Sequence, residues 1–275
     1  MKRFFIAFCV LCIAVTSAQA RDFKWKRDAM DGSRTGVSVP GKDNVKQALG
    51  EVSGDVWTSP SGKVFRSGSA PKVAALVIEA QPSMSIVKEV VGYAPEDMVK
   101  QAPESSLTNW FIDNFMVAAG EITGRHIDFA IGNFGGVRVN IAAGDVLYDD
   151  IRSMFPFKNQ VVYIPVKGAD VLRILEGMAA TKIEILGGVR IVVKDKKLVS
   201  AEIGGKPVEA DKTYGLATIS FLVTGGDGLK LGDYACGDIL WTDTDIFDAM
   251  MSQVLKARIE GRPIEGKVDS RVTIL

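Results

Sequence analysis

Phe157 and Phe221 each lie near a polar side chain and a glycine-rich segment. Asn159 follows Phe157 closely, and Asp227 follows Phe221 within the run TGGDGL. Two aromatic faces, an amide and a carboxylate are the groups that would hold a planar ligand carrying hydroxyl groups. Phenylalanine is more often a core residue than a ligand platform, so a packing role is the alternative for both rings.

His126 is the single histidine among 275 residues, which limits the hydrolytic chemistry that the chain can perform. Metal sites that activate water usually recruit several histidines and carboxylates, and an acyl-transfer triad needs histidine as its base. The sequence has no Gly-x-Ser-x-Gly segment to supply a nucleophilic serine. We therefore expect His126 to have a structural role at the edge of a strand.

Two glycine-containing segments partly match known ion and phosphate loops. Residues 36–43, GVSVPGKD, have the spacing of a phosphate loop, but Asp43 stands where a hydroxyl residue must hold magnesium. A turn is the expected structure there. Residues 224–233, TGGDGLKLGD, lack the start of a calcium loop. Asp227 in this segment either closes a glycine turn through backbone hydrogen bonds or faces a ligand, and the residues alone leave both open.

The first 20 residues are typical of a secretory signal peptide. Lys2 and Arg3 precede an apolar run from Phe4 to about Val15, and a small-residue ending follows at 18–20. The run is too short for a membrane span of about 20 residues. We expect a soluble, exported chain that begins near Arg21 and is located in a periplasm or outside the cell.

The composition is that of an ordinary globular protein. Without Lys2 and Arg3 the formal charge changes from 33 − 33 to 31 − 33, which gives no electrostatic basis for binding nucleic acid. Two of the three cysteines lie in the signal peptide, so Cys236 is left alone and no disulfide within the chain is expected. Apolar residues make up 47% of the chain, enough for a sizeable core.

Hydrophobic periodicity and turn residues predict a mixed α/β (α+β) domain from 84 to 275, with a mixed sheet and flanking helices. Residues 21–70 are rich in turn residues and are predicted to be irregular, so that 21–83 form an extension ending in a linker-like helix. The predicted elements are helices at 71–91 (broken near Pro82), 105–120, after 168 and 246–259, strands at 126–131, 160–166, 212–223 and 271–275, and a hairpin turning at 195–197.

Four segments in this domain resemble those of the C-terminal domain of the 5′-nucleotidase family, in the same order and at roughly the same spacing. They are GNFGGVR at 132–138, AGDVLYDDIRSMFPFKN at 143–159, VKGADVLRILEGM at 166–178 and ATISFLVTGGDGL at 217–229. The resemblance covers about 84 to 275. In that family this domain binds the nucleoside part of the substrate, and a separate N-terminal domain carries two catalytic metals.

The resemblance implies a base-binding role for four residues. Phe157 and Phe221 would stack on the two faces of the base. Asn133 and Asn159 would meet its edge through amide groups, which both donate and accept hydrogen bonds.

The resemblance also implies roles toward the sugar and the phosphate. Asp227 would accept hydrogen bonds from the ribose hydroxyls, and Arg138 would face the phosphate with a permanent forked cation. The family often carries further arginines upstream, where residues 94–109 of this chain offer Lys100 alone.

The metal motifs of the family's catalytic domain, D-x-H, G-D-x-x-D, G-N-H-E and G-H-x-H, are absent from the sequence. We therefore expect no catalytic residue, metal or other cofactor in this chain, and two divalent metals in a separate metallophosphoesterase chain that acts as a partner. Together they would dephosphorylate nucleotides. One alternative is a non-catalytic envelope or assembly protein that keeps the fold without binding a ligand. A self-sufficient hydrolase with an unrecognised site is the other.

Overall fold

The computed structural model describes residues 44–275, and its internal contacts divide the chain into two units, Met1–Ile78 and Glu79–Leu275. The predicted signal peptide and the glycine segment 36–43 lie outside the described residues. Among the residues that are described, no helix is long and apolar enough to cross a membrane.

The first unit contains a small antiparallel sheet in the order β1-β2-β3. Its elements are α2 (Val45–Leu49), β1 (Glu51–Ser53), β2 (Val56–Thr58), β3 (Val64–Phe65) and most of α3 (Ala70–Ala80). The rings of Trp57 and Phe65 stack with their centroids 4.9 Å apart, and Trp57 Nε1 donates to the carbonyl of Leu49 at 2.9 Å. The hydrogen bond of Trp57 joins α2 to the sheet, and the stacked rings join β2 to β3.

The prediction of irregular structure for 21–70 is wrong for the part of it that is described. The turn-rich segment 58–63 forms the turn between β2 and β3, where Gly62 has a φ angle of +80°, and Gly54, at φ +56°, lies in the turn between β1 and β2. The strands between them are two or three residues long, too short to produce a visible alternation. The helix predicted for 71–91 does break near Pro82, but its second half forms the 3-10 helix η2 (Ile86–Lys88) and a strand instead.

The second unit contains three sheets, in the orders β13-β7-β12-β5-β8, β11-β10-β9-β14 and β4-β6. The strands are β4 (Val90–Ala94), β5 (Phe129–Gly132), β6 (Gly144–Leu147), β7 (Gln160–Lys167), β8 (Ile185–Gly187), β9 (Val189–Lys194), β10 (Lys197–Ile203), β11 (Lys206–Pro207), β12 (Thr213–Ile219), β13 (Leu240–Asp245) and β14 (Val272–Ile274). The predicted mixed α/β class is confirmed, because parallel and antiparallel pairs occur in the same sheets.

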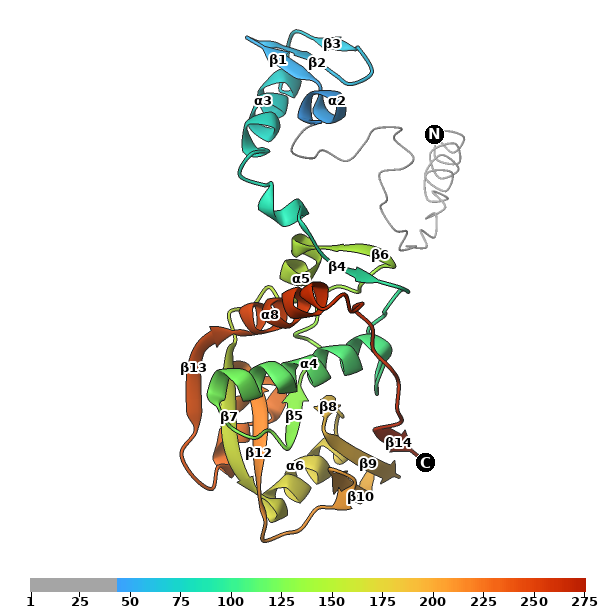
Figure 1. Cartoon of the computed structure of the whole chain (residues 1–275), viewed down its shortest axis with the longest axis vertical. Helices are drawn as coiled ribbons and strands as arrows, with labels where there is room; N and C mark the ends of the chain where they lie inside the picture. Colours follow the sequence, from blue (N-terminus) through green and yellow to red (C-terminus); the bar gives the residue numbers. More distant parts are fainter. Residues whose placement is uncertain (1–43) are drawn as a thin grey trace, which may run out of the picture. The chain divides into compact units, whose positions relative to one another are not determined.

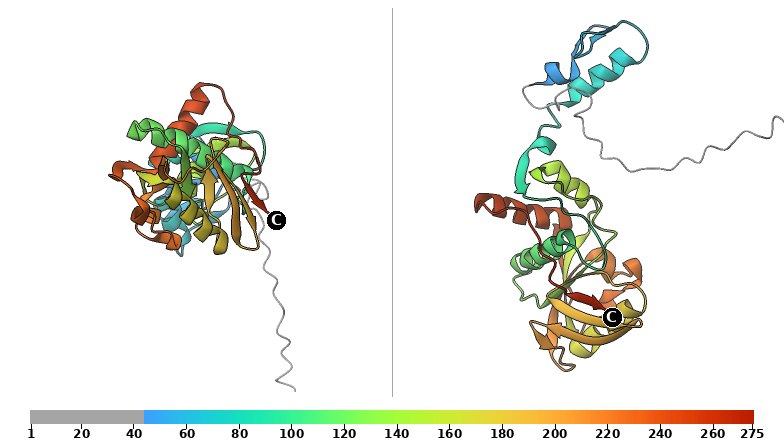
Figure 2. Two further views of the ribbon diagram at one scale, coloured as in Figure 1. Left: turned by 90° about the horizontal axis from the view of Figure 1, so that it is seen from below. Right: turned by 90° about the vertical axis from the view of Figure 1, so that its right-hand side faces the viewer.

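The helices of this unit are α4 (Ser106–Thr123), α5 (Tyr148–Met154), α6 (Gly168–Ala180), α7 (Ser220–Val223) and α8 (Ile246–Ile259), with 3-10 turns η3 (Gly226–Gly228) and η4 (Leu231–Tyr234). Helices α4 and α8 pack side by side, and α4 also contacts strands of the five-stranded sheet (Figure 1, Figure 2). Helix α6 packs against β7 and β10. Residues 214–219 of β12 are all buried, so both faces of this central strand are covered.

Helix α4 begins where its sequence predicts and ends later. The Ser105 side chain accepts a hydrogen bond from the backbone N–H of Thr108 at 3.2 Å, which caps the helix. The predicted stop at Gly120 is wrong, because the helix continues to Thr123. It ends at Gly124, which adopts the left-handed conformation at φ +63° that favours glycine.

Arg271 joins three separate parts of the second unit. Its guanidinium donates to both carboxylate oxygens of Asp113 on α4 at 2.8 and 3.0 Å, to Asp269 at 2.8 Å and to the carbonyl of Leu186 on β8 at 3.2 Å. Arg271 is 6% exposed. The residue immediately before β14 is therefore hydrogen-bonded to α4 and to β8, the outermost strand of the five-stranded sheet.

Arg271→Met is expected to lower the free energy of unfolding by about 2–3 kcal/mol, because several charge-assisted hydrogen bonds are lost. The two carboxylates are about half exposed, so they are not left as fully buried charges. Urea unfolding at pH 7 measures the effect. The matched control is Arg190→Met, which removes an exposed ion pair with the same Asp269 and is expected to cost less than about 1 kcal/mol. Equal losses in the two variants would contradict a special role for Arg271.

The effect of Arg271→Met is also expected to depend on pH. Burial acts to raise the pKa of Asp269, but the hydrogen bond and charge of Arg271 outweigh it, so this pKa lies below its usual value. A depressed carboxyl pKa contributes stability that is present above the unfolded pKa and is lost as pH falls through the folded pKa. The difference between wild type and variant should therefore shrink below about pH 4. A difference as large at pH 3 as at pH 7 would rule this out.

Candidate functional site

The candidate site lies at one edge of the five-stranded sheet. Strands β5 and β12 are parallel, with Leu216 opposite Phe129, so their carboxyl ends meet at the same edge. Strand β7 is antiparallel to β12, with Val161 opposite Ile219, so its first residues lie at that edge as well. Carboxyl ends of parallel strands are a common place for ligand sites.

The segments that follow or precede these strand ends are held together by side chains. The Thr218 hydroxyl on β12 donates to the carbonyl of Ile131 on β5 at 2.8 Å. The Ser220 hydroxyl, at the start of α7, accepts from the N–H of Gln160 at 3.0 Å. These two bonds connect the sheet to α7 and fix the start of β7 beside it.

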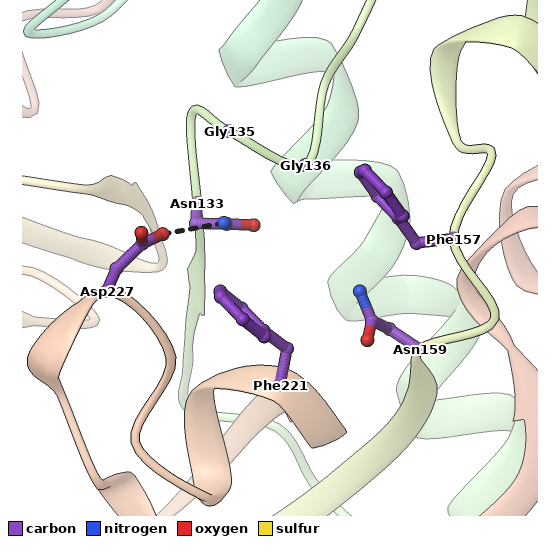
Figure 3. Close-up of a pocket in the computed structure, with 7 residues that line it drawn as sticks. All are labelled: Asn133, Gly135, Gly136, Phe157, Asn159, Phe221 and Asp227. Atoms are coloured by element: carbon purple, nitrogen blue, oxygen red, sulfur yellow. Dashed lines mark hydrogen bonds between the residues drawn. The ribbon is translucent and has the colours of Figure 1, made fainter.

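A pocket of about 220 Å³ opens at this edge (Figure 3). Its lining residues lie on the segments that follow β5 and β12 or precede β7, and are Asn133, Gly135, Gly136, Phe157, Asn159, Phe221 and Asp227. Five of the six residues predicted for the site are therefore brought together, although they are spread over more than 90 positions of the sequence. Arg138 is not among the lining residues.

The two phenylalanines are not core residues. Phe157 is 47% exposed and Phe221 is 41% exposed. Phe157 lies in the loop between α5 and β7, and Phe221 lies on the short helix α7. The prediction that Phe221 belongs to the edge of a strand is wrong, because β12 ends at Ile219 and the chain turns there into α7.

A hydrogen bond between Asn133 and Asp227 connects the loop after β5 to the loop after α7. The Asn133 amide donates to Asp227 Oδ2 at 2.7 Å, between residues that are 94 positions apart. Asn133 is 5% exposed, whereas Asp227 lies at the surface in a backbone conformation with φ +50°. This conformation is uncommon for a residue other than glycine, although Asp tolerates it better than most. The bond fixes the direction of the Asp227 carboxylate toward the pocket.

Two glycines leave room for the side chains that surround the pocket. A Cβ atom at Gly136 would lie 2.5 Å from Asn133 Oδ1, and a Cβ atom at Gly226 would lie 2.4 Å from the Phe221 ring. Real Cβ contacts are longer than this. The glycines of both loops therefore permit the side chains of Asn133 and Phe221 to occupy their places.

Asn159 directs its side-chain amide into the space between the two phenylalanines (Figure 3). Its backbone carbonyl accepts from the N–H of Ile246 at 2.8 Å, which fixes the residue to the start of α8. The predicted contacts of Asn133 and Asn159 with a base stay predictions.

Arg138 lies at the rim of the site. Its guanidinium carbon is 5.8 Å from the centroid of the Phe157 ring, and one of its nitrogens donates to the carbonyl of Gly135 at 3.3 Å. The backbone N–H of Arg138 donates to the carbonyl of Met154 at 3.0 Å, which ties the end of the glycine loop to α5. Arg138 is exposed, so its charge is accessible from the rim.

Lys100 lies behind the same loop. Its ammonium group donates to the carbonyls of Phe134 and Val137 at 3.0 and 2.5 Å. From the sequence, Lys100 was identified only as the cation within residues 94–109. Its pKa is lowered, first by burial and then by the nearby positive charges of Arg138 and Lys182.

His126 lies apart from the pocket residues. Its side chain is 86% exposed and its Nε2 is 3.5 Å from Asp128. Within residues 44–275, no three His, Cys, Asp or Glu side chains are grouped so as to hold a metal ion.

Comparison with known proteins identifies the family. The model of the 5′-nucleotidase C-terminal domain matches residues 90–233, which is more than half of the 275 residues. The chain belongs to this family, and the resemblance predicted from its sequence motifs is confirmed.

Curated relatives are longer than this chain. Protein UshA of Escherichia coli is 36% identical over 150 residues, which are 53% of this chain and 26% of UshA. The 5′-nucleotidase of Vibrio cholerae is 34% identical over 157 residues, which are 54% of this chain and 27% of the relative. The matched part is therefore about a quarter of the length of these relatives.

Solved structures share the fold. The 5′-nucleotidase precursor from Thermus thermophilus has a TM-score of 0.64 at 22% identity, over 80% of this chain and 48% of that one. NAD nucleotidase (NadN) of Haemophilus influenzae has a TM-score of 0.53 at 19% identity, over 80% of this chain and 47% of that one.

Gly226→Ala is expected to displace the Phe221 ring, because the new methyl group and the ring cannot occupy their present positions together. NMR of the protein with labelled phenylalanine measures the ring resonances of Phe221 directly. Gly177→Ala on α6 is the matched control, since a Cβ atom there meets nothing within 4 Å. Unchanged Phe221 resonances in Gly226→Ala would mean that the two loops adjust without moving the ring.

Proposed function

We propose that this chain is an exported nucleotidase-type domain that binds nucleosides and nucleotides at the pocket between Phe157 and Phe221. One observation carries the proposal: two half-exposed aromatic rings flank a pocket into which an amide and an oriented carboxylate also face. A nucleoside offers a flat base to the rings and two hydroxyl groups to the carboxylate.

The two phenylalanines bind the base. Stacking on an aromatic ring contributes about 1–3 kcal/mol per base and tolerates different bases, because every base has a π-face. The Asn159 amide, which both donates and accepts, contacts the edge of the base. This arrangement binds nucleosides as a class, with the choice of base depending on the edge contacts.

Asp227 binds the ribose. Its Oδ2 already accepts from Asn133, and Oδ1 accepts from a ribose hydroxyl when a nucleoside is bound. An oriented carboxylate has less freedom to lose on binding, which favours affinity. Asn133 contributes by holding this carboxylate, in addition to any contact of its own with the base.

Arg138 faces the phosphate of a nucleotide from the rim. Because its guanidinium is solvated there, the pair it forms with phosphate is weak and is screened by salt. The nucleoside part of the ligand therefore supplies most of the binding free energy.

Hydrolysis of the bound nucleotide requires a metallophosphoesterase, which we propose is a separate chain carrying two divalent metals. The relatives that this chain matches are about four times the length of the matched part. In this proposal the predicted signal peptide at 1–20 exports this chain to the periplasm or outside the cell, and the partner chain acts in the same compartment. In this proposal the chain presents nucleotides to the enzyme and supports nucleotide catabolism.

The stacking role is tested by Phe157→Ala and Phe221→Ala. Each variant is expected to weaken adenosine binding by about 1–3 kcal/mol, or roughly 5- to 150-fold, in calorimetric titration. Phe65→Ala is the matched control, because it removes a stacked ring from the other unit and should leave adenosine affinity unchanged. Folded variants of Phe157 and Phe221 that bind adenosine as the wild type does would return both rings to a structural role.

The phosphate role is tested by titrating wild type and Arg138→Ala with adenosine and with its monophosphate at two salt concentrations. The wild type is expected to prefer the monophosphate by less than about tenfold, or roughly 1.4 kcal/mol. Arg138→Ala should remove this preference and leave adenosine affinity nearly unchanged. A preference far above tenfold would show that other cations reach the phosphate, and loss of adenosine binding in the variant would show that Arg138 holds the glycine loop.

A further inference from the structure

We propose that Lys100 and Glu184 are positioning residues that hold the glycine loop (residues 132–138) in its ligand-binding conformation. They do so through hydrogen bonds to the backbone carbonyl and the backbone N–H of Phe134. This inference rests on the proposed function, because it explains how the loop that carries Asn133 is kept in place.

Lys100 holds the carbonyl side. Its ammonium group has three N–H donors, and two of them reach the carbonyls of Phe134 and Val137. These carbonyls lie three positions apart, so one side chain bridges both ends of the turn that contains Gly135 and Gly136. Val137 is buried in the core and Phe134 packs against it, but Gly135 and Gly136 between them have no side chains to pack, and Lys100 spans this part of the turn.

The segment that carries Lys100 is itself hydrogen-bonded to the residues that follow the loop. The backbone N–H of Lys100 donates to Asn140 Oδ1 at 2.9 Å. Met98 and Ile141 exchange two backbone hydrogen bonds, at 2.8 and 3.1 Å. The ammonium group is therefore presented to the loop from a rigid support.

Glu184 holds the amide side. It is 1% exposed and precedes β8, and its Oε2 accepts from the N–H of Phe134 at 2.8 Å. The other oxygen, Oε1, forms an ion pair with Lys182. A buried carboxylate is costly unless it is paired and hydrogen-bonded, and here one oxygen accepts from the Phe134 N–H and the other is paired with Lys182. Phe134 is thus held through its N–H by an anion and through its carbonyl by a cation.

These contacts also argue against a direct contact between Lys100 and a phosphate, which its charge would otherwise suggest. Two of its three donors are already used by backbone carbonyls, and it is absent from the residues that line the pocket. Lys100 therefore acts on a ligand through the loop, whereas Arg138 acts from the rim.

The test compares Lys100→Met with Lys100→Arg, Glu184→Gln and a control, Lys167→Met. Lys167 likewise donates to a backbone carbonyl, that of Asp211, at 3.1 Å, and lies outside the pocket. Two measurements are made on each full-length variant: amide hydrogen exchange of the 132–140 segment without ligand, and calorimetric titration with adenosine and with its monophosphate.

We expect Lys100→Met to accelerate exchange at Phe134 and Gly136 and to weaken adenosine binding about tenfold or more, because two charge-assisted hydrogen bonds are lost. Lys100→Arg keeps donors and should restore part of both effects. Glu184→Gln keeps an acceptor for the Phe134 N–H and should be milder than Lys100→Met. Lys167→Met should match the wild type.

Unchanged exchange and unchanged adenosine affinity in Lys100→Met would overturn the proposal. So would a loss of monophosphate affinity alone with normal exchange, because Lys100 would then contact the phosphate directly. Exchange reports on the loop without ligand: if the wild type binds no nucleoside while exchange still accelerates, the proposed function fails and the positioning role stands.

Discussion

The pairing of β12 with its two neighbours is the constraint on which the site depends. Because β5 runs parallel to β12 and β7 runs antiparallel, the ends of two strands and the start of a third converge at one edge. Asn133, Asn159 and Phe221, which lie next to these strand ends, are therefore close together. Burial of β12 on both faces makes a change of register costly, since every side chain would change face.

The loops at this edge are held by polar contacts as well as by packing, since Val137 is buried in the core and Phe134 packs against it. Asn133 binds Asp227 across the pocket, while Lys100 and Glu184 hold the backbone of Phe134 from behind. Such contacts leave the pocket faces of the phenylalanines exposed and still fix the frame around them. Exposure of two large rings lowers stability relative to burial, and it is explained when a flat ligand covers them. The same frame would suit either binding of free nucleosides or presentation of nucleotides to an enzyme.

Much of this could be predicted from the sequence, and the misses have physical causes. Helices α4 and α8 and strands β5 and β7 were predictable from periodicity and capping, and linked motifs gave the family. The structure of 44–65 was missed because its strands are too short to show a period. Phe221 was assigned to a strand because three apolar residues, Phe221 to Val223, follow β12 after Ser220. The Lys100 and Glu184 contacts join residues 34 and 50 positions from Phe134, which no local pattern reveals.

The central claim is that a base lies between Phe157 and Phe221. The most direct measurement is NMR of adenosine in exchange with the protein, following the two base protons H2 and H8. Ring currents of two stacked phenylalanines shift protons above their faces upfield, so both base protons should move upfield on binding, and the shift should decrease in Phe157→Ala and in Phe221→Ala. Binding without an upfield shift, or an upfield shift in both variants as large as that in the wild type, would contradict the account.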